Sequence, residues 1–561
     1  MDARNRKPNP LGGFFVGIVF FAVGWVWKST FGSAMDAADR LFLGIFQFFG
    51  ALALLYGFID MVTLARRRQA REAALRPSDA FGSAAFATLE ECRKEGLLDP
   101  RGLYLGLLDG QPLFYSGKAH LITIAPARQG KGIGVVIPNL LHWQGSAFVT
   151  DPKGELAAVT AQHRKERFGH KVFVLNPWGL HNLPRHRFNP LQPLLEAASD
   201  PVLVRGIADE AKALALQLIP EPEDAKNAYF RDGSRQILRS LMLHFATRGD
   251  PENCTLTELW RTVNSPKQLA VVVTKMERSK QLNGAIAALA EDLSFQIKDN
   301  PDQFADFRQG AVQALDIFDP VGWLGDAVSG SDVDFASLKA GRATIYLVIP
   351  QDRIDTHGRW LGLVARQAIT AVARSKGTTP VLFMLDEFAN MGKLTGLAES
   401  LTALPGLGVR VWAFVQELAE IVRLYGPNTA QTLLSQAEVM QLFAVQNLDF
   451  ARRISASLGQ QTVKTRSYGL GSRTDHEVTE SVGETAQPLL TPDQLRQLPA
   501  DEQLLFVTRL PPIKAKRIPF WCIQPWGSWV QQNPVEGSYP TVPAVITLNY
   551  RKKAAGGQAS A

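Results

Sequence analysis

The chain is poor in cysteine, and its histidines form no recognisable metal site. Its 561 residues include three cysteines, Cys92, Cys254 and Cys522, which lie far apart and form no C-x-x-C pair. This excludes a disulfide framework and a zinc-cysteine cluster, and it is typical of a protein whose bulk lies in a reducing compartment. The sequence His476-Glu-Val-Thr-Glu480 has a glutamate where a zinc-protease helix needs its second histidine, so we interpret it as a polar loop.

The chain also lacks a strong charge of one sign over most of its length. The net charge is +7, but residues 1–71 contribute +5 of it and the remaining residues only +2. Bulk charge therefore gives no evidence for nucleic-acid binding. Non-specific DNA binding is left open and would need a local basic surface.

Two long apolar runs are present, at residues 11–27 and 41–59. A helix needs about 20 apolar residues to cross a bilayer, so we predict a two-helix membrane anchor over residues 1–75. A signal peptide is the competing interpretation of the first run, but the second run would still remain as an anchor. Basic residues flank the pair on both sides, and by the positive-inside rule they place both ends in the cytoplasm: Arg4, Arg6, Lys7, Arg66, Arg67, Arg68 and Arg71.

The segment 120–137 has the order of a phosphate-binding loop: an apolar strand, a Gly-Lys turn and a helix start. In such a loop the backbone N–H groups and the helix N-terminus point at the phosphates, and the lysine ammonium reaches the terminal ones. We predict that the nucleotide-binding loop is formed by Ala125, Pro126, Ala127, Arg128, Gln129, Gly130, Lys131, Gly132 and Ile133. The match to G-x-x-x-x-G-K-[ST] is imperfect at Ala125 and Gly132, and a strand-to-helix turn with a solvated lysine is the alternative.

Two further apolar strands end in polar residues that suit the same chemistry. The strand 381–385 runs into Asp386 and Glu387, which we predict to hold Mg²⁺ and to act as the base for an attacking water. The strand 409–415 ends in Gln416, an amide suited to sensing the γ-phosphate or orienting water. An acidic helix N-cap and a polar residue at a helix N-terminus are the respective alternatives.

Strands alternate with helices along most of the chain, which predicts an α/β fold with a parallel, doubly wound sheet. After the anchor we expect a helical or irregular linker and then strands at 113–116, 120–125, 146–151 and 171–176. Residues 196–328 show almost no strand pattern, and the strand pattern resumes only at 342–349. In this region Phe230, Ile237, Leu241 and Phe245 fall on one helical stripe.

We therefore predict a nucleotide-binding domain in two parts, 76–195 and 329–540, interrupted by an inserted all-α domain, 196–328. The polar segment 467–483 is interpreted as an exposed hairpin or loop, and 541–561 as a flexible tail.

Together these parts resemble the type IV secretion coupling proteins of the TraG/TrwB-like kind. The resemblance rests on the two-helix anchor and on motifs that follow in order: Ala125-Pro-Ala-Arg-Gln-Gly-Lys-Gly132, Asp151-Pro-Lys-Gly-Glu155, Phe188-Asn-Pro-Leu191, Leu385-Asp-Glu-Phe388 and Gln416. It implies a RecA-like P-loop ATPase that uses ATP and Mg²⁺, forms a homo-hexamer at the inner membrane, and delivers a relaxase–DNA complex or effector proteins to the components of a type IV secretion channel.

The resemblance also bears on single residues. It implies that Mg²⁺ relies on Asp386, because position 132 offers no hydroxyl. It further implies an arginine that acts in trans on a neighbouring subunit. Between Glu387 and Gln416 the sequence offers only Arg410 for this role, and a surface arginine at a helix–strand turn is the alternative.

Two other functions compete with this interpretation. A septal DNA translocase of the FtsK type shares the ATPase fold. We expect such a translocase to have a long linker and a C-terminal winged helix, and neither is evident in this sequence. We also expect it to have no helical insert, whereas this sequence predicts one. A membrane receptor that binds substrates without hydrolysing ATP is the other alternative. The combination of Lys131, Asp386 and Glu387 favours hydrolysis.

Overall fold

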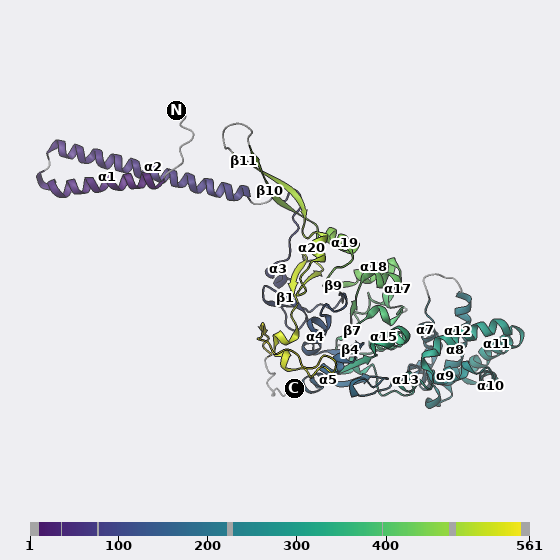
Figure 1. Cartoon of the computed structure of the whole chain (residues 1–561). Helices are drawn as coiled ribbons and strands as arrows, with labels where there is room; N and C mark the ends of the chain where they lie inside the picture. The colour runs from purple at the N-terminus through teal and green to yellow at the C-terminus, as the bar shows by residue number, and fades with distance from the viewer. Residues whose placement is uncertain are drawn as a thin grey trace. The chain divides into compact units, whose positions relative to one another are not determined.

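The computed structural model of the chain describes residues 10–34, 36–75, 78–221, 228–377, 379–394, 396–470 and 478–550. Backbone contacts divide it into two compact units, residues 1–84 with 456–489 and residues 85–455 with 490–561. The first unit contains two long helices and a β-hairpin, and the second contains a large sheet with the helices around it (Figure 1).

The two long helices of the first unit are α1 (Pro10–Phe31) and α2 (Ala37–Leu75), which pack side by side (Figure 1). Both are long and apolar enough to cross a membrane, over Gly12–Ala34 and Ala37–Gln69. They approach closely because glycines face each other: a Cβ on Gly13 would lie 2.9 Å from the Cα of Gly57. The predicted pair of apolar helices is thus present.

The second helix is longer than the sequence predicted. It continues past residue 59 and includes the basic residues Arg66, Arg67 and Arg68, since Ala, Leu and Arg in this stretch are all good helix formers. The basic residues at positions 4, 6 and 7 lie outside the described residues.

The hairpin of the first unit is formed by β10 (Gln460–Leu470) and β11 (Val478–Pro488), which pair antiparallel along their whole length. This agrees with a hairpin at 467–483, although the strands begin earlier and end later than predicted. Residues 471–477, which include His476 and Glu477, lie outside the described residues.

One sheet of 11 strands forms the centre of the second unit, in the order β2-β1-β13-β12-β9-β3-β8-β7-β4-β6-β5. The strands from β9 to β5 in this order run parallel. The predicted α/β fold with a parallel sheet is confirmed. The strands are β1 (Leu103–Leu108), β2 (Gln111–Tyr115), β3 (His120–Ile124), β4 (Ser146–Asp151), β5 (Lys171–Leu175), β6 (Ala343–Val348), β7 (Val381–Leu385), β8 (Val409–Val415), β9 (Ala437–Leu442), β12 (Glu502–Val507) and β13 (Ile513–Lys516).

The central parallel strands are buried along their whole length. Every residue of β3, β4, β6 and β7 is buried, as expected for parallel strands covered on both faces. This burial explains why the sequence shows them as continuous apolar runs rather than as alternating patterns.

The other end of the sheet is antiparallel, which the sequence analysis did not predict. Strands β12, β13, β1 and β2 extend the sheet beyond β9. The expected linker before residue 113 therefore contains a strand, β1. It joins β2 through Asp109 and Gly110, whose φ angles of 49° and 75° are those of a tight hairpin turn.

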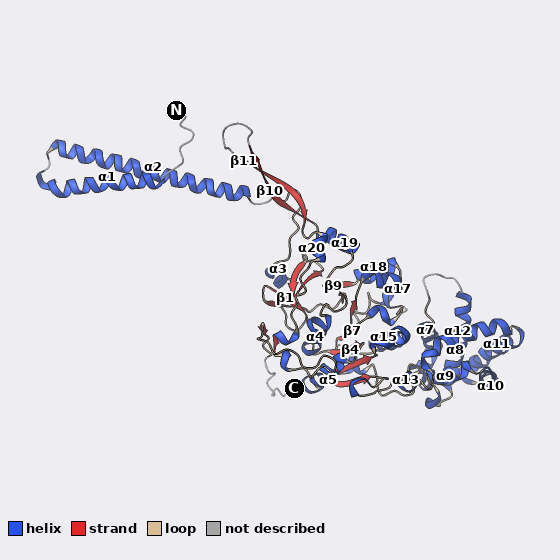
Figure 2. Cartoon of the chain, viewed as in Figure 1, coloured by secondary structure: helices blue, strands red, loops and turns tan. Residues whose placement is uncertain are grey.

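Between β5 and β6 the described residues, 176–221 and 228–342, form helices and no strand (Figure 2). This agrees with a helical insertion in the sheet, whereas domain boundaries at 196 and 328 stay a prediction. Its α-helices in the described residues are α6 (Gln192–Ser199), α7 (Ile207–Leu218), α8 (Ala228–Thr247), α9 (Leu256–Asn264), α10 (Pro266–Glu277), α11 (Ala285–Asp299), α12 (Pro301–Leu315), α13 (Trp323–Ala327) and α14 (Ser337–Ala340).

Helix α8 lies at the centre of this insertion and packs against α6, α7, α11 and α12. Its residues Ile237, Leu241 and Phe245 are buried, as the helical stripe predicted. Phe230 is 43% exposed, so its place on the buried stripe was wrong. It lies in the first turn of the helix, where its ring stacks edge-on against Phe307.

Other helices precede β1 or connect later strands. They are α3 (Leu89–Lys94), α4 (Ile137–His142), α5 (Glu155–Phe168), α15 (Ile354–Arg374), α16 (Leu397–Ser400), α17 (Leu418–Tyr425), α18 (Pro427–Ser435), α19 (Leu448–Leu458) and α20 (Pro492–Arg496).

The end of the described chain is folded, which corrects the prediction of a flexible tail from residue 541. Strand β15 (Ile546–Thr547) pairs with β14 (Ile523–Gln524). The Tyr550 hydroxyl bonds to a ring nitrogen of His142 at 2.6 Å and accepts a hydrogen bond from Trp526 at 2.7 Å. Residues 551–561 lie outside the described residues.

Candidate active site

Neighbouring strands deliver the predicted functional residues to one edge of the sheet. Strands β3, β8, β7 and β4 are consecutive neighbours and run parallel. Ile124, the last residue of β3, pairs with Val415, the last residue of β8. The loop after β3, the amide of Gln416 and the acids after β7 therefore all begin at the carboxyl edge, where ligands of open α/β sheets bind.

The loop after β3 has the backbone of a phosphate cradle. Arg128 and Gly130 have φ angles of 62° and 73°, the left-handed conformation that lets a chain turn sharply. The turn leads into η3 (Gly132–Val136), a single π-helical turn that continues into α4. The N–H of Gly134 donates to the carbonyl of Gly130 at 2.9 Å, so the helix begins directly at the turn.

Lys131 bridges the two acids that follow β7. Its Nζ lies 2.5 Å from Oδ1 of Asp386 and 3.1 Å from Oε1 of Glu387. The lysine side chain is 16% exposed and those of the two acids 15%. Burial by itself lowers the pKa of the Lys131 ammonium, but the charges of Asp386 and Glu387 outweigh this effect and raise the pKa above its usual value. The lysine is therefore held charged.

Gln416 completes this cluster. Its Nε2 donates to Oε2 of Glu387 at 3.0 Å, while its backbone N–H donates to Glu420 at 3.2 Å. Glu387 itself has a φ of 53°, and its N–H donates to Oδ1 of Asp386 at 2.9 Å. Strained backbone of this kind persists only when its surroundings hold it, and it is frequent at functional sites.

The structure thus brings Lys131, Asp386, Glu387 and Gln416 together. The other predicted loop residues surround them: Ala125 is buried at the end of β3, Ala127 and Arg128 are exposed, and Ile133 packs against the core. The predicted roles of all these residues in binding and catalysis stay predictions.

Arg410 does not suit an arginine that acts on a neighbouring subunit. It is the second residue of β8, whereas the site lies beyond the last one. It is only 6% exposed, its guanidinium lies 5.6 Å and 5.3 Å from the ring centres of Tyr115 and Trp143, and Nη2 donates to the carbonyl of Gly117. A side chain packed in this way is not available to a second subunit, and this corrects the expectation from the sequence.

One acid of the site had been given no role by the sequence analysis. Asp151 ends β4, the neighbour of β7, and is 1% exposed. Burial, together with the nearby Asp386, raises its pKa to about 6. The preceding Thr150 donates its hydroxyl to the carbonyl of Asp386 at 2.8 Å. The run of apolar residues that precedes Asp151 was the available signal, since it repeats the pattern before Asp386.

Arg517 also belongs to the site and had no signal in the sequence. It follows β13, and its Nη1 donates to the carbonyl of Gln129 in the loop, 388 positions earlier. Nη2 donates to the carbonyl of Ala500, and the guanidinium lies 3.7 Å from the ring centre of Phe443. The arginine therefore ties the phosphate-type loop to the antiparallel part of the sheet.

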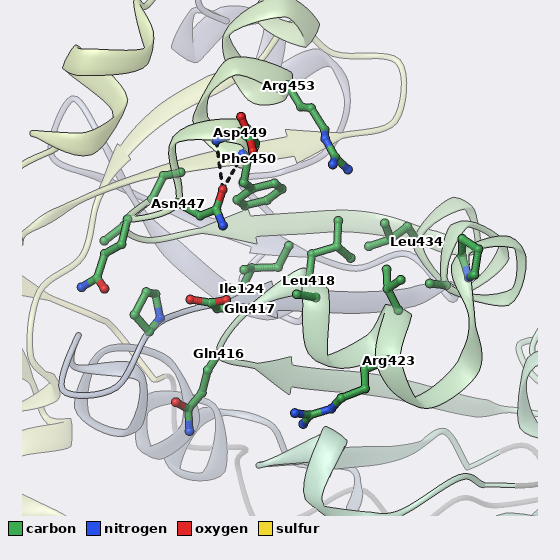
Figure 3. A pocket seen from close by; sticks show the side chains of 18 of the residues that line it. Ile124, Gln416, Glu417, Leu418, Arg423, Leu434, Asn447, Asp449, Phe450 and Arg453 are labelled. Atoms are coloured by element: carbon green, nitrogen blue, oxygen red, sulfur yellow. Dashed lines mark hydrogen bonds between the residues drawn. The ribbon is translucent and has the colours of Figure 1, made fainter. Parts of the chain in front are cut away.

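Beside the loop lies a cavity of about 740 Å³. Pro126 and Gln416 line it together with residues of α17, α18 and α19. Figure 3 shows Ile124, Leu418 and Leu434 in its middle and the guanidinium groups of Arg423 and Arg453 on opposite sides. The cavity is thus apolar at its centre, and its charged lining residues are of both signs, Glu417 and Asp449 as well as Arg423 and Arg453.

The side chains do not form a complete metal site by themselves. Among the described residues, no group of three or more His, Cys, Asp or Glu side chains is arranged to hold a metal ion. The buried carboxylates of Asp386 and Asp151 are hard oxygen ligands, and Mg²⁺ is usually bound by one or two carboxylates plus phosphate oxygens and water. The residues present fit such a shared site.

Residues 78–534 match a protein family described as Type IV secretory system Conjugative DNA transfer. Protein VirD4 of Rhizobium rhizogenes is 26% identical over 464 residues, which cover 80% of this chain and 66% of that protein. Conjugal transfer protein TraG of Escherichia coli is 27% identical over 472 residues, which cover 75% of this chain and 71% of that protein. The chain spans about two thirds of the length of the VirD4 protein.

Solved structures of the plasmid coupling protein TrwB have a similar fold. The complex of TrwB with a non-hydrolysable ATP analogue has a TM-score of 0.57 and 15% identity, covering 78% of this chain and 96% of that chain. The complex with ADP and Mg²⁺ has a TM-score of 0.56 and 14% identity, covering 78% and 93%. At these identities the likeness is one of fold.

Proposed function

The chain belongs to the type IV secretory system conjugative DNA transfer family, and from this premise we propose that it is an ATPase that couples substrates to a type IV secretion channel at the inner membrane. The substrates are a relaxase–DNA complex or effector proteins. The observation that carries the ATPase proposal is the cluster of Lys131, Asp386, Glu387 and Gln416 at the carboxyl edge of the sheet.

The loop 125–133 is proposed to hold the phosphates of ATP. Its backbone N–H groups and the start of the helix after it supply the positive end of a helix dipole. Lys131 supplies the charge that the terminal phosphates need, and its present ion pairs with Asp386 and Glu387 keep its ammonium aimed into the site. On this proposal the ammonium exchanges carboxylate partners for phosphate oxygens when the triphosphate binds.

Asp386, with Asp151 beside it, would hold Mg²⁺, which neutralises phosphate charge when bound. Lys131 then has a second function, since its ammonium balances the carboxylates of Asp386 and Glu387. The absence of a hydroxyl at Gly132 fits this arrangement, in which the ligands come from β7 and β4.

Glu387 is proposed as the base that takes a proton from the attacking water. Its Oε1 accepts a hydrogen bond from Lys131, which follows β3, and its Oε2 accepts one from Gln416, which follows β8. These two donors hold the carboxylate in place. Gln416 is proposed to orient this carboxylate and, through its amide, the γ-phosphate or the water. The αL conformation of Glu387 directs this side chain away from the strand.

The location follows from α1 and α2, which we propose span the inner membrane with the bulk of the chain in the cytoplasm. Assembly into a homo-hexamer is proposed as well. Ala127 and Arg128 of the loop are exposed, and this supports a site that a neighbouring subunit completes. We propose no residue for the arginine that would act in trans, because Arg410 is buried at the opposite edge of the sheet.

The test uses two variants of the full-length chain, assayed for ATP hydrolysis in detergent and for substrate transfer in cells. Lys131→Ala should abolish hydrolysis and transfer. Glu387→Gln should retain bound ATP while hydrolysis falls by about 10²-fold or more, the usual contribution of a general base. Lys165→Ala, an exposed change on α5, is the matched control and should behave as wild type.

Folding must be measured in parallel, because Lys131→Ala leaves two buried carboxylates without their cation and should lower the melting temperature. Glu387→Gln does not have this defect and separates catalysis from folding. Transfer at the wild-type rate in both variants would reject the ATPase in favour of a substrate receptor that does not hydrolyse ATP.

A further inference from the structure

A second cavity lies at the opposite, amino edge of the sheet. The segments that precede β7 and β8 line it, together with residues before β1, between β2 and β3 and before β6, and its volume is about 910 Å³. None of the predicted nucleotide-binding residues contributes to it except Arg410, the one whose role had to be corrected. The charged side chains of its lining are Asp99, Arg101, Lys118, Lys339, Lys376 and Arg410.

This lining carries a strong excess of positive charge. Five of its six charged side chains are cations, and the one acid, Asp99, is bound by Arg101 at 2.8 Å. Within the part of the chain that the structure describes, the other four cations make no ion pair with a carboxylate. Glu438 acts on Arg410 from β9, but its carboxylate already accepts the hydroxyl of Tyr115.

Two of the cations are buried with incomplete partners. Arg410 is 6% exposed, and its Nε and Nη1 have no hydrogen-bond partner. Lys339 is 3% exposed and donates to the carbonyl of Leu407. In the described residues Lys339 has only this neutral carbonyl as a hydrogen-bond partner, and Arg410 has one carbonyl and two aromatic rings. Burying a cation without an anionic partner is costly, and an anion nearby offsets that cost.

The backbone makes room for these groups. Gly408 has a φ of 73°, and a Cβ at this position would lie 2.7 Å from Nζ of Lys339. The missing side chain at Gly408 therefore leaves room for the Lys339 ammonium. Lys118 and Lys376 are exposed at the mouth of the cavity, where their ammonium groups can meet a ligand from solvent.

We propose that this cavity binds a phosphate-bearing ligand. Lys118, Lys376 and Lys339 contact its oxygens, and the buried charge of Arg410 adds to the positive potential behind them. The excess of four positive charges suits a multiply charged anion better than a single carboxylate, and phosphate is the anion that lysine clusters bind as point charges. The phosphates belong to a soluble polyphosphate or to a nucleic-acid strand, and the site is distinct from the loop at 125–133.

The test measures binding of two probes to the full-length chain in detergent, with Lys131→Ala present in every arm to weaken the loop site. The probes are inorganic tripolyphosphate, measured by calorimetry, and a fluorescent single-stranded oligonucleotide, measured by anisotropy. The variant Lys118→Glu with Lys376→Glu reverses two exposed charges at the cavity mouth. We expect it to weaken binding of at least one probe by about tenfold or more at low salt.

The matched control is Lys165→Glu with Lys298→Glu, which makes the same change of charge at exposed positions outside the cavity. It should bind both probes within about twofold of the parent, since distant exposed charges are screened. Loss of tripolyphosphate binding alone identifies a soluble polyphosphate, and loss of oligonucleotide binding identifies a nucleic-acid strand. Equal binding by the variant and the control, or no binding of either probe by the parent, overturns the proposal and leaves the ATPase proposal untouched.

Discussion

At the scale of single residues, the central feature is a lysine with two alternative sets of partners. Lys131 pairs with Asp386 and Glu387. Phosphate oxygens compete for the same ammonium. On the proposed function, binding of a triphosphate would change the charge balance of both acids at once, and Glu387 would be activated only when substrate is present.

Arg517 is expected to position the loop without contacting the nucleotide. Replacing it by methionine removes the hydrogen bond to the Gln129 carbonyl and keeps an apolar contact with Phe443. We expect Arg517→Met to raise the KM for ATP by about tenfold and to change kcat much less, because it disorders a binding loop and leaves Glu387 in place. Steady-state kinetics of the purified chain measure both constants.

The neighbouring Lys516→Met is the control, since that side chain is 64% exposed and its nearest acid, Asp501, is 3.7 Å away. Its KM should equal that of the wild type. An unchanged KM in Arg517→Met would show that the loop holds its conformation without the arginine.

At the scale of elements, helix α5 carries a buried cation that makes the fold sensitive to acid. Arg164 is fully buried and donates to the carbonyls of Leu140, Trp143 and Gly145. His170 lies next to it, and burial, with the nearby Arg164 charge, lowers the pKa of its imidazole to about 3. Arg164 also donates to the hydroxyl of Thr344 in β6, which connects α5 to the sheet. A second positive charge beside Arg164, on protonated His170, is unfavourable.

This arrangement predicts the direction of the pH dependence. The folded pKa of His170 lies below its ordinary value of 6.5, so the unfolded chain takes up the proton first. The contribution of neutral His170 to the free energy of unfolding is fully present above pH 6.5. It decreases as the pH falls toward 4, by on the order of 2–3 kcal/mol. Chemical denaturation of wild type and His170→Gln between pH 7 and pH 4 measures it.

In His170→Gln the loss over this range should be smaller by about 2 kcal/mol, because glutamine gains no proton. Other buried histidines, such as His163 with a pKa lowered to about 4 by burial, should leave a residual slope. Identical pH profiles for the two proteins would contradict the assignment to His170.

The helical insertion is the element that we expect to select the substrate. It interrupts the sheet between β5 and β6 and adds no residue to the cluster around Lys131. Replacing residues 196–328 by the insertion of a related coupling protein should change which substrate is transferred, while ATP hydrolysis continues. A transfer assay with both cognate substrates tests this prediction.

The exchange must preserve the contacts of α15 with the insertion. Arg374 pairs with Glu210 at 2.8 Å, and Arg359 donates to the carbonyl of Gln313 at 3.1 Å. If substrate choice stays the same in a folded chimera, the insertion is a stabilising cap and recognition lies elsewhere, for example in the segment after Pro511.

At the scale of the whole molecule, the proposed membrane topology of α1 and α2 can be tested by cysteine labelling. A cysteine at Ala34, between α1 and α2, should react with an impermeant thiol reagent applied to intact spheroplasts, and one at Gln69 should not. Cys92 and Cys254 are buried, and Cys522 is partly exposed. The labelling is therefore done in a Cys522→Ser background, so that only the introduced cysteine reacts. The opposite labelling pattern would contradict the proposed topology.

The sequence by itself determined the parallel sheet, the loop and the acids that follow β7. These features are encoded locally: a short, fully apolar run predicts a buried parallel strand, and Gly130-Lys131 or Asp386-Glu387 directly after such a run marks its carboxyl end. The apolar runs of α1 and α2 are equally local signals. The same reasoning could have included Asp151, which follows a run of the same kind.

Only the tertiary structure decided the contacts between distant parts of the chain. The antiparallel strands β1, β12 and β13, the hydrogen bond of Arg517 to the loop, and the burial of Arg410 between Tyr115 and Trp143 all join residues far apart in sequence. Local pattern carries no information about such pairs, because their energy comes from burial and partners that exist only when the sheet has formed. Arg410 therefore looked like a surface arginine in the sequence and is a buried one in the fold.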